Sequence, residues 1–297
     1  MSCRRTLALK TWALWASIAL LTGDSEGLRP FRTDDNGTVP LGHVGFELAA
    51  DLAFEKSDRR VVFPALSLKA GVADRVELDL EGGYQFVRSE GSKASGFTDT
   101  TLKVKARLYD GADALPSLAT TLGMILPTED PSIRPSRDLG FLALAQASSD
   151  FQSFIYYANI GLELSEEPRE QRNELHKDLR WGLAFEIPLQ ANAALAVDFF
   201  GRTQPDSGVA QSGLLGAIWR SPWKIDFDFA VIAGLTPGAD DVGLTMGLTY
   251  QFPVFGTAGQ QQAVRRSSIQ DQRSLQGPMS QTECLLRMSR KQMRQVR

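Results

Sequence analysis

The chain of 297 residues carries a formal net charge of −3, and 43% of its residues are hydrophobic. This composition excludes an intrinsically disordered chain, and no stretch reaches the roughly 18 consecutive apolar residues that a membrane-spanning helix needs. The two cysteines, Cys3 and Cys284, lie at opposite ends of a chain that has two histidines, which excludes a disulfide scaffold and a Cys/His zinc site. The sequence has no Walker loop, dinucleotide-binding glycine motif or EF-hand. We therefore expect no metal, no cofactor and no nucleic-acid partner.

The first 23 residues have the pattern of a secretory signal peptide. Arg4, Arg5 and Lys10 precede an apolar run over 12–21. Such a run has the length of the hydrophobic core of a signal and is too short to span a bilayer. An amphipathic helix or a membrane anchor is the alternative interpretation of residues 1–23.

The charges divide the rest of the chain into an acidic body and a basic tail. Residues 24–252 carry 21 basic and 33 acidic side chains, hence −12, whereas residues 253–297 carry eight basic and two acidic ones, hence +6. The tail is rich in Gln and Arg, and we expect it to be disordered. Residues 24–41 form a polar segment before the body, and the sequence leaves open whether they are a periplasmic lead or a plug inside a barrel.

Apolar and polar residues alternate with period two through most of the body. Leu78 and Leu80, for example, alternate with Glu77, Asp79 and Glu81. Because successive side chains of a strand point to opposite faces, this pattern predicts strands with one apolar and one polar face. We predict twelve of them, over 43–55, 61–72, 75–87, 99–109, 117–126, 139–147, 153–164, 179–189, 194–201, 211–220, 223–235 and 242–252.

The predicted connections alternate between long, polar segments and tight turns. The long ones include residues 88–98 and 165–178, and the short ones include 73–74 and 190–192. Outer-membrane barrels have long external loops, short periplasmic turns and an even number of strands. Aromatic residues also stand near the predicted strand ends: Phe54, Tyr84, Phe86, Trp219, Trp223, Tyr250 and Phe252. The sequence thus predicts an all-β fold, a single antiparallel up-and-down transmembrane barrel over 42–252, with a soluble sandwich or a lipocalin-like binder as alternatives.

Three segments also carry a family resemblance. They are the element TDDNGT at 33–38 with the strand that follows it, the stretch GFTDTTLKVKARLYDGADALPSLATTLGMILPTED at 96–130, and DVGLTMGLTYQF at 241–252. Together they resemble bacterial outer-membrane barrels of the "MetA-pathway of phenol degradation" family, a group of candidate transporters, over about 28–252. The resemblance implies a barrel in the outer membrane of a Gram-negative-type bacterium and passage of small molecules, without naming the solute. Its partners would be outer-membrane lipids, a small solute and the barrel-insertion machinery, which recognises an aromatic last strand such as 250–252.

The polar face of the predicted strands supplies the candidate pore-lining residues. They are Glu47, Asp51, Lys69, Glu77, Asp79, Glu81, Lys103, Lys105, Arg107, Arg180, Glu186, Asp198, Asp226 and Asp228; Glu163 and Lys224 share that face. The acidic row of 75–87 lies opposite the basic row of 99–109, so the two can form cross-strand ion pairs. Two interpretations remain open: the rows brace the wall, or they set a transverse field that orients a solute. The mixture of signs argues against strong ion selectivity.

The function we predict is passive or facilitated passage of small molecules, including aromatic or hydrophobic ones. An enzyme is the first rival, because barrel lipid hydrolases use Ser and His. His43, Ser67 and His176 are the residues available, and there is no G-x-S-x-G motif. We expect no enzymatic activity. An adhesive or structural barrel is the second rival, although the predicted loops are of moderate length.

Overall fold

Every regular element in the computed structural model is a strand. The structure describes residues 29–56, 58–111, 115–133, 139–151, 153–169, 172–204 and 208–254. The predicted signal peptide and residues 255–297 of the predicted tail lie outside these ranges. The strands are β1 (His43–Glu55), β2 (Asp58–Ala73), β3 (Val76–Ser89), β4 (Ser92–Phe97), β5 (Thr100–Tyr109), β6 (Ser117–Leu126), β7 (Gly140–Phe151), β8 (Phe154–Arg169), β9 (Arg172–Gln190), β10 (Ala193–Gln204), β11 (Gly208–Arg220), β12 (Ile225–Gly234) and β13 (Val242–Pro253). The described residues contain no helix long and apolar enough to cross a membrane.

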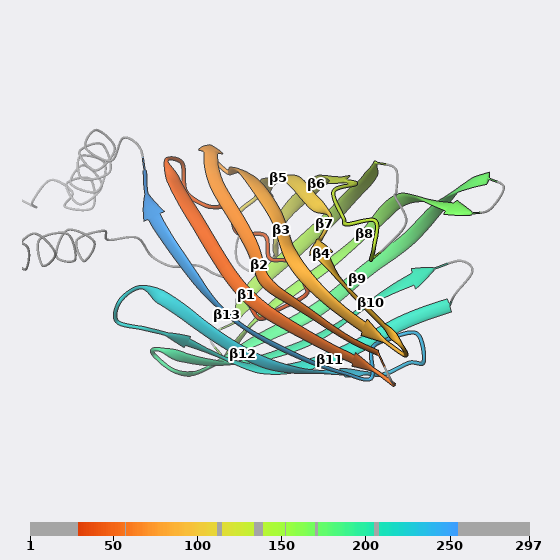
Figure 1. The fold of residues 1–297 in the computed structure, drawn as a ribbon. Coiled ribbons are helices and arrows are strands. Elements are labelled where there is room, and N and C mark those ends of the chain that lie inside the picture. Colours follow the sequence, from red (N-terminus) through yellow and green to blue (C-terminus); the bar gives the residue numbers. More distant parts are fainter. Residues whose placement is uncertain are drawn as a thin grey trace, which may run out of the picture. The chain divides into compact units, whose positions relative to one another are not determined.

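The thirteen strands close into an antiparallel barrel of twelve spans (Figure 1). The first and last strands pair along their length, from Val44 opposite Phe252 to Phe54 opposite Val242. β4 and β5 share one span, because β4 pairs with the second half of β3 and β5 with its first half. Closure pairs the first strand with the last, so the backbone groups of the twelve spans find partners within the barrel wall without water. The predicted fold class is confirmed.

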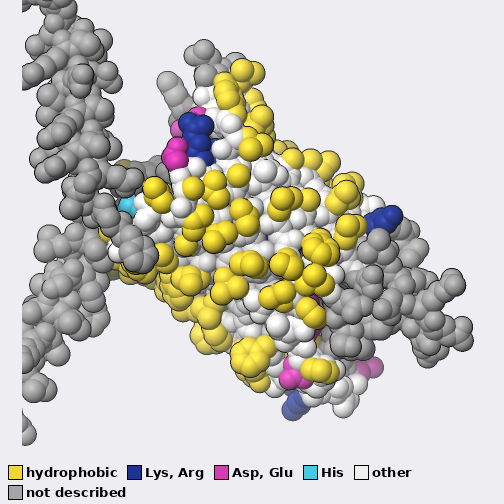
Figure 2. All heavy atoms as spheres, turned by 90° about the horizontal axis from the view of Figure 1, so that it is seen from above, with side chains coloured by type: hydrophobic (Ala, Val, Ile, Leu, Met, Phe, Trp, Pro, Cys, Tyr) yellow, Lys and Arg dark blue, Asp and Glu magenta, His cyan; other side chains and the backbone are white. Residues whose placement is uncertain are grey.

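The outer face of the barrel is apolar. Exposed side chains from nearly all spans form this face: Leu66, Leu68, Leu78, Leu80, Leu102, Val104, Leu122, Phe141, Ile160, Leu162, Leu183, Phe199, Leu215, Phe229, Val231 and Met246. Figure 2 shows hydrophobic side chains spread over the visible outer surface, with the charged ones at its margins. Aromatic contacts occur at both ends, for example Tyr84 with Phe97 (centroids 5.5 Å apart) and Trp219 with Trp223 (6.4 Å). A closed barrel with an apolar outer band and aromatic girdles is the architecture of the bacterial outer membrane.

The connections differ from those that the sequence predicted. The segment 165–178 was expected to be a loop, but β8 continues to Arg169 and β9 begins at Arg172. The expected loop over 88–98 contains β4, and residues 56–57 alone join β1 to β2. The sequence of these strand extensions is mostly polar and shows no period-two alternation. Lys224 is also displaced from the predicted polar face, because it lies in the turn before β12 with a φ of 61°.

One inner wall is apolar, contrary to the expectation of a polar lumen throughout. Buried side chains of β10, β11 and β12 form a cluster, against which Phe31, Phe200 and Ile232 pack: Ala194, Ala196, Leu214, Ile218 and Ala230. Leu142 and Leu144 of β7 are buried as well. Apolar side chains thus occupy parts of the inner face of β7, β10 and β11, which explains why the period-two alternation of these three strands is weak.

Candidate functional site

Residues 29–39 lie inside the barrel. Their polar contacts reach side chains on β1, β3, β5, β7, β10, β12 and β13. Because these strands surround the lumen, a single short segment can touch all of them only from within it. We name residues 29–39 the lumenal segment.

The most buried contact of the lumenal segment is with Asp198 on β10. One carboxylate oxygen accepts the backbone N–H groups of Arg32 (2.7 Å) and Thr33 (2.9 Å). The other oxygen accepts the Thr33 hydroxyl at 2.6 Å. Asp198 is fully buried, and a buried carboxylate needs such donors to offset its lost hydration.

The element TDDNGT binds the opposite wall. The Asp35 carboxylate lies 2.8 Å from Lys105 Nζ, and the Arg107 guanidinium donates to the carbonyl of Asn36 at 3.0 Å. The Asn36 side chain accepts the hydroxyl of Ser148 at 2.6 Å. This element is therefore held between β5 and β7.

Two arginines attach the beginning of the lumenal segment to β1 and β12. Arg32 lies 2.8 Å from Asp51, and Arg29 lies 3.7 Å from the same carboxylate oxygen. Arg29 also lies 3.5 Å from Asp228 and donates to Thr245 at 2.6 Å. At the other end of the segment, the backbone N–H of Val39 donates to Glu77 at 2.7 Å.

Two wall glycines allow the chain to approach this closely. A Cβ on Gly182 would lie 2.1 Å from the Thr33 hydroxyl oxygen, and one on Gly71 would lie 2.1 Å from the carbonyl oxygen of Pro40. Both positions therefore require glycine as long as the lumenal segment is in place.

The remaining charges of the wall form ion pairs with one another. Lys69 lies 2.6 Å from Glu47, and Lys103 lies 2.5 Å from Glu81. Arg220 lies 2.5 Å from Glu186 and 4.0 Å from Asp226. Within the acidic and basic rows, Glu77 is the cross-strand partner of Lys105, and Asp79 is that of Lys103. Asp79 also accepts the Ser67 hydroxyl at 2.8 Å.

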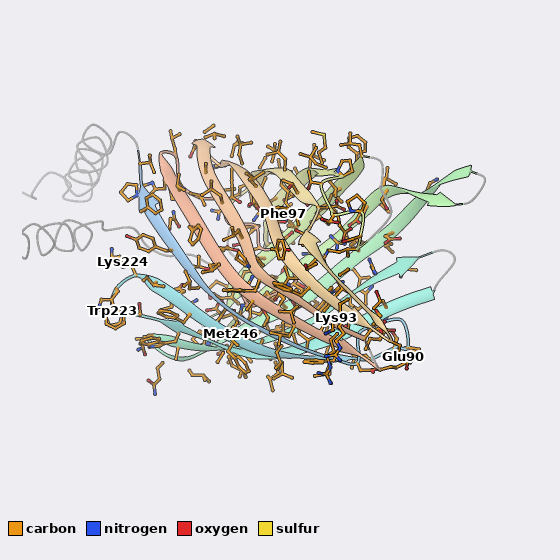
Figure 3. All side chains as sticks on the ribbon, viewed as in Figure 1. Glu90, Lys93, Phe97, Trp223, Lys224 and Met246 are labelled. Carbon is orange, nitrogen blue, oxygen red and sulfur yellow. The ribbon has the colours of Figure 1, made fainter. Side chains whose placement is uncertain are left out.

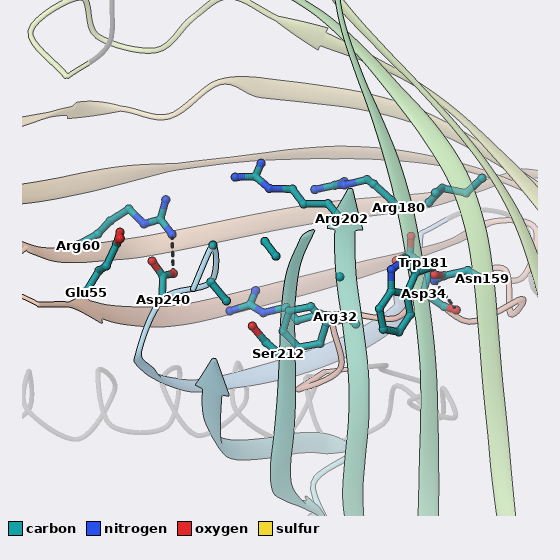
Figure 4. Close-up of a pocket in the computed structure, with 16 residues that line it drawn as sticks. Arg32, Asp34, Glu55, Arg60, Asn159, Arg180, Trp181, Arg202, Ser212 and Asp240 are labelled. Carbon is teal, nitrogen blue, oxygen red and sulfur yellow. Dashed lines mark hydrogen bonds and ion pairs between the residues drawn. The ribbon is translucent and has the colours of Figure 1, made fainter. Parts of the chain in front are cut away.

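A water-accessible vestibule lies between the lumenal segment and the end of the barrel where β1 is joined to β2 (Figure 4). One cavity of about 520 Å³ is lined by Arg180, Arg202, Asn159 and Phe200, and shares Arg32, Arg60 and Asp240 with a second cavity of about 460 Å³. Three arginines that line it are paired with carboxylates: Arg60 with Asp240 (3.2 Å), Arg180 with Glu163 (3.2 Å) and Arg202 with Asp178 (3.9 Å). We name this end the loop end, and the end where β13 finishes the terminal end.

The structure brings the fourteen candidate residues to one lumen but divides them into three sets. One set holds the lumenal segment: Asp51, Glu77, Lys105, Arg107, Asp198 and Asp228. A second set pairs within the wall: Glu47, Lys69, Asp79, Glu81, Lys103, Glu186 and Asp226. Arg180, the remaining residue, lines the vestibule, as does Asp51 of the first set.

Sequence reasoning missed the arginines that complete these sets: Arg29, Arg32, Arg60, Arg202 and Arg220. Arg202 and Arg220 continue the polar positions of their strands, so extending the alternation beyond 194–201 and to the end of 211–220 would have found them. No local pattern marks Arg29 and Arg32, because their partners are distant in sequence.

Of the residues considered for hydrolysis, Ser67 and His43 have separate partners, and the side chain of His176 lies outside the described part of the chain. The Ser67 hydroxyl donates to Asp79, whereas the His43 ring lies 3.4 Å from the carbonyl of Leu41. Within the described ranges, no group of three or more His, Cys, Asp or Glu residues is arranged to hold a metal ion.

Comparison with known proteins agrees with this architecture. The outer-membrane channel COG4313 from Pseudomonas putida F1 superposes with a TM-score of 0.58 at 12% identity, covering 75% of this chain and 100% of that one. The NanC porin gives a TM-score of 0.52 at 8% identity, covering 69% of this chain and 98% of that one. No curated protein matches the sequence. The model of the family described as "Putative MetA-pathway of phenol degradation" matches residues 29–252, and the chain belongs to this family.

Proposed function

We propose that the protein is an outer-membrane channel for small molecules and that its lumenal segment restricts passage. The terminal end would face the periplasm and the loop end the outside, because the longest connection between neighbouring spans, residues 127–139, lies at the loop end. A solute would enter the vestibule and then meet the lumenal segment.

The observation that carries the proposal is the charged, water-accessible vestibule beneath an apolar outer band. A barrel that served only as a wall or an anchor would not need ionic side chains around cavities of about 520 and 460 Å³. Both arginines and carboxylates line the vestibule, which favours neutral or dipolar solutes over simple ions. Phe200 lines both cavities and Ile232 lines the second, so a solute with an aromatic or other apolar part would find a matching wall.

Conductance of the refolded full chain in planar bilayers tests this proposal. The comparison is with a variant in which residues 29–38 are replaced by a Gly/Ser segment of equal length. We expect small, solute-permeable conductance for the unchanged chain and a severalfold larger one for the variant. Liposome swelling with a neutral sugar and with a small aromatic alcohol compares the solute classes. Absence of conductance in both proteins would contradict a channel, and equal conductance would contradict a restricting role for the lumenal segment.

A further inference from the structure

Three basic side chains stand in direct cross-strand register on the outside of the barrel. Arg59 of β2 lies opposite Arg88 of β3, which in turn lies opposite Lys93 of β4. Neighbouring strands are about 4.8 Å apart, so the three residues form a row about 10 Å wide. We name Arg59, Arg88 and Lys93 the basic row.

The basic row faces outward at the loop end. Arg59 is the cross-strand partner of the outward-facing Phe54, and its guanidinium lies 6.0 Å from that ring. Arg88 lies two residues after Phe86 on β3, so both side chains point to the same face, and Phe86 is 49% exposed on the outside of the barrel. In Figure 3, Lys93 and Glu90 lie at the end of the barrel opposite Trp223 and Lys224.

The three cations lack an anion within the described part of the chain. The charges of the inner wall are matched at 2.5–4.0 Å, whereas no carboxylate in the described ranges lies within 4.0 Å of Arg59, Arg88 or Lys93. Like charges directly opposite each other across strands are destabilising. A row of this kind therefore indicates an anion supplied from outside the protein.

An apolar surface adjoins the basic row on the side of the membrane band. A depression of about 430 Å³ is lined by the three cations together with Val61, Phe86 and Ser95. Tyr84 packs edge-on against Phe86 and Phe97, with ring centroids 5.1 and 5.5 Å away. The surface thus has positive charge toward the loop end and apolar side chains toward the membrane band. This combination suits an anionic lipid rather than a soluble anion.

We propose that the basic row and the adjoining depression bind lipid A, the phosphorylated glycolipid of the outer leaflet. Guanidinium groups bind phosphate oxygens in a bidentate manner, and a row about 10 Å wide can contact a headgroup at more than one point. An acyl chain would lie over Val61 and Phe86. This assignment uses the orientation given under the proposed function, but it does not require the protein to conduct.

Binding of lipid A to the purified full chain in detergent tests the proposal. The probe is bis-phosphorylated lipid A, and the readout is the number of bound lipids by native mass spectrometry together with the shift in unfolding temperature. The variant Arg59→Gln/Arg88→Gln should bind about 30-fold more weakly, because each basic side chain at a membrane surface contributes roughly a factor of five. Arg75→Gln/Lys224→Gln removes the same charge from the terminal end and should bind as the unchanged protein does. Arg59→Lys/Arg88→Lys should retain most of the binding.

Three further ligands identify what the basic row recognises. Dephosphorylated lipid A should bind as weakly as lipid A binds to Arg59→Gln/Arg88→Gln. Phosphatidylglycerol, with one phosphate, should bind at least tenfold more weakly than lipid A, and inorganic phosphate should not displace lipid A at millimolar concentration. Equal binding of lipid A to the unchanged protein and to Arg59→Gln/Arg88→Gln would overturn the proposal, as would equal binding of phosphatidylglycerol. The binding experiment does not measure conductance, so a negative result for lipid A would leave the channel proposal intact.

Discussion

The Asp198 carboxylate and the Thr33 hydroxyl oxygen lie 2.6 Å apart, although 165 residues separate them in the chain. The same carboxylate accepts the backbone N–H groups of Arg32 and Thr33. One side chain on β10 thus holds the middle of the lumenal segment against the wall.

Asp198→Ala should release the lumenal segment. It removes three hydrogen bonds to a charged acceptor, and the loss should weaken docking by about 3–5 kcal/mol. We expect a larger mean single-channel conductance and more frequent open-level fluctuations. Asp150→Ala removes an equal charge from an exposed position at the terminal end and serves as the control. Conductance traces that do not differ between the two variants would show that Asp198 does not hold the segment closed.

Gly182→Ala tests the docking of the lumenal segment at a second contact of Thr33, the one with β9. The new Cβ would lie 2.1 Å from the Thr33 hydroxyl oxygen, so the segment must move away from β9. We expect conductance to rise, and trypsin to cleave after Arg32 faster in the folded protein. Gly213→Ala is the matched control, because its Cβ would have no neighbour closer than 3.8 Å. Equal cleavage of both variants would contradict the close approach at Gly182.

Ion selectivity should depend on the vestibule and not on the paired charges of the wall. Arg180 and Arg202 have side chains that are 45% and 49% exposed, whereas the Lys103 side chain is 13% exposed and bonded to Glu81. Arg180→Gln/Arg202→Gln should shift the reversal potential in a KCl gradient toward cations, by on the order of twofold in the permeability ratio. The charge-neutral control Lys103→Gln/Glu81→Gln should leave the reversal potential unchanged. The opposite result would favour the transverse field of the acidic and basic rows.

The ion pair between Glu47 and Lys69 should stabilise the wall. Its atoms lie 2.6 Å apart, and both side chains are largely buried. Lys69→Gln alone leaves a carboxylate without its cation and should lower the free energy of unfolding by about 2–3 kcal/mol. The double variant Glu47→Gln/Lys69→Gln should cost at least about 1 kcal/mol less than the sum of the two single variants. Urea unfolding in lipid vesicles gives the free energies of unfolding of the two single variants and the double variant. If the effects of the two single substitutions simply add, the ion pair does not stabilise the wall.

The barrel should assemble without residues 255–297. Every span lies within 43–253, and the last contact of the sheet is the backbone N–H of Val254 with the carbonyl of Gly42 at 2.8 Å. A chain ending at Val254 should therefore insert and show the heat-modifiable gel band of a closed barrel, whose mobility changes when the sample is boiled. Tyr250 and Phe252, which stack with ring centroids 5.6 Å apart, remain as the aromatic end of β13. Failure to insert would show that the tail takes part in assembly.

The strands of this protein are predictable because a barrel strand has a different solvent on each face. Leu78 and Leu80 face lipid, whereas Glu77 and Asp79 face the lumen. The polarity of the side chains therefore alternates from one residue to the next along the strand. The same rule fails where both faces have similar polarity. Residues 165–169 and 172–178 are mostly polar, and Leu214 and Ile218 are buried inside an apolar wall, so neither region shows strong alternation.

The sequence by itself determined the twelve spans, their polar faces and the family. Only the tertiary structure decided that residues 29–39 run through the lumen, that Asp198 meets Thr33, and that the basic row is continuous across three strands. Period-two alternation is a local property, set by the neighbours of each residue within one strand. Docking of a segment without regular structure depends on contacts between residues more than a hundred positions apart in the sequence. Such contacts produce no periodic pattern in the sequence.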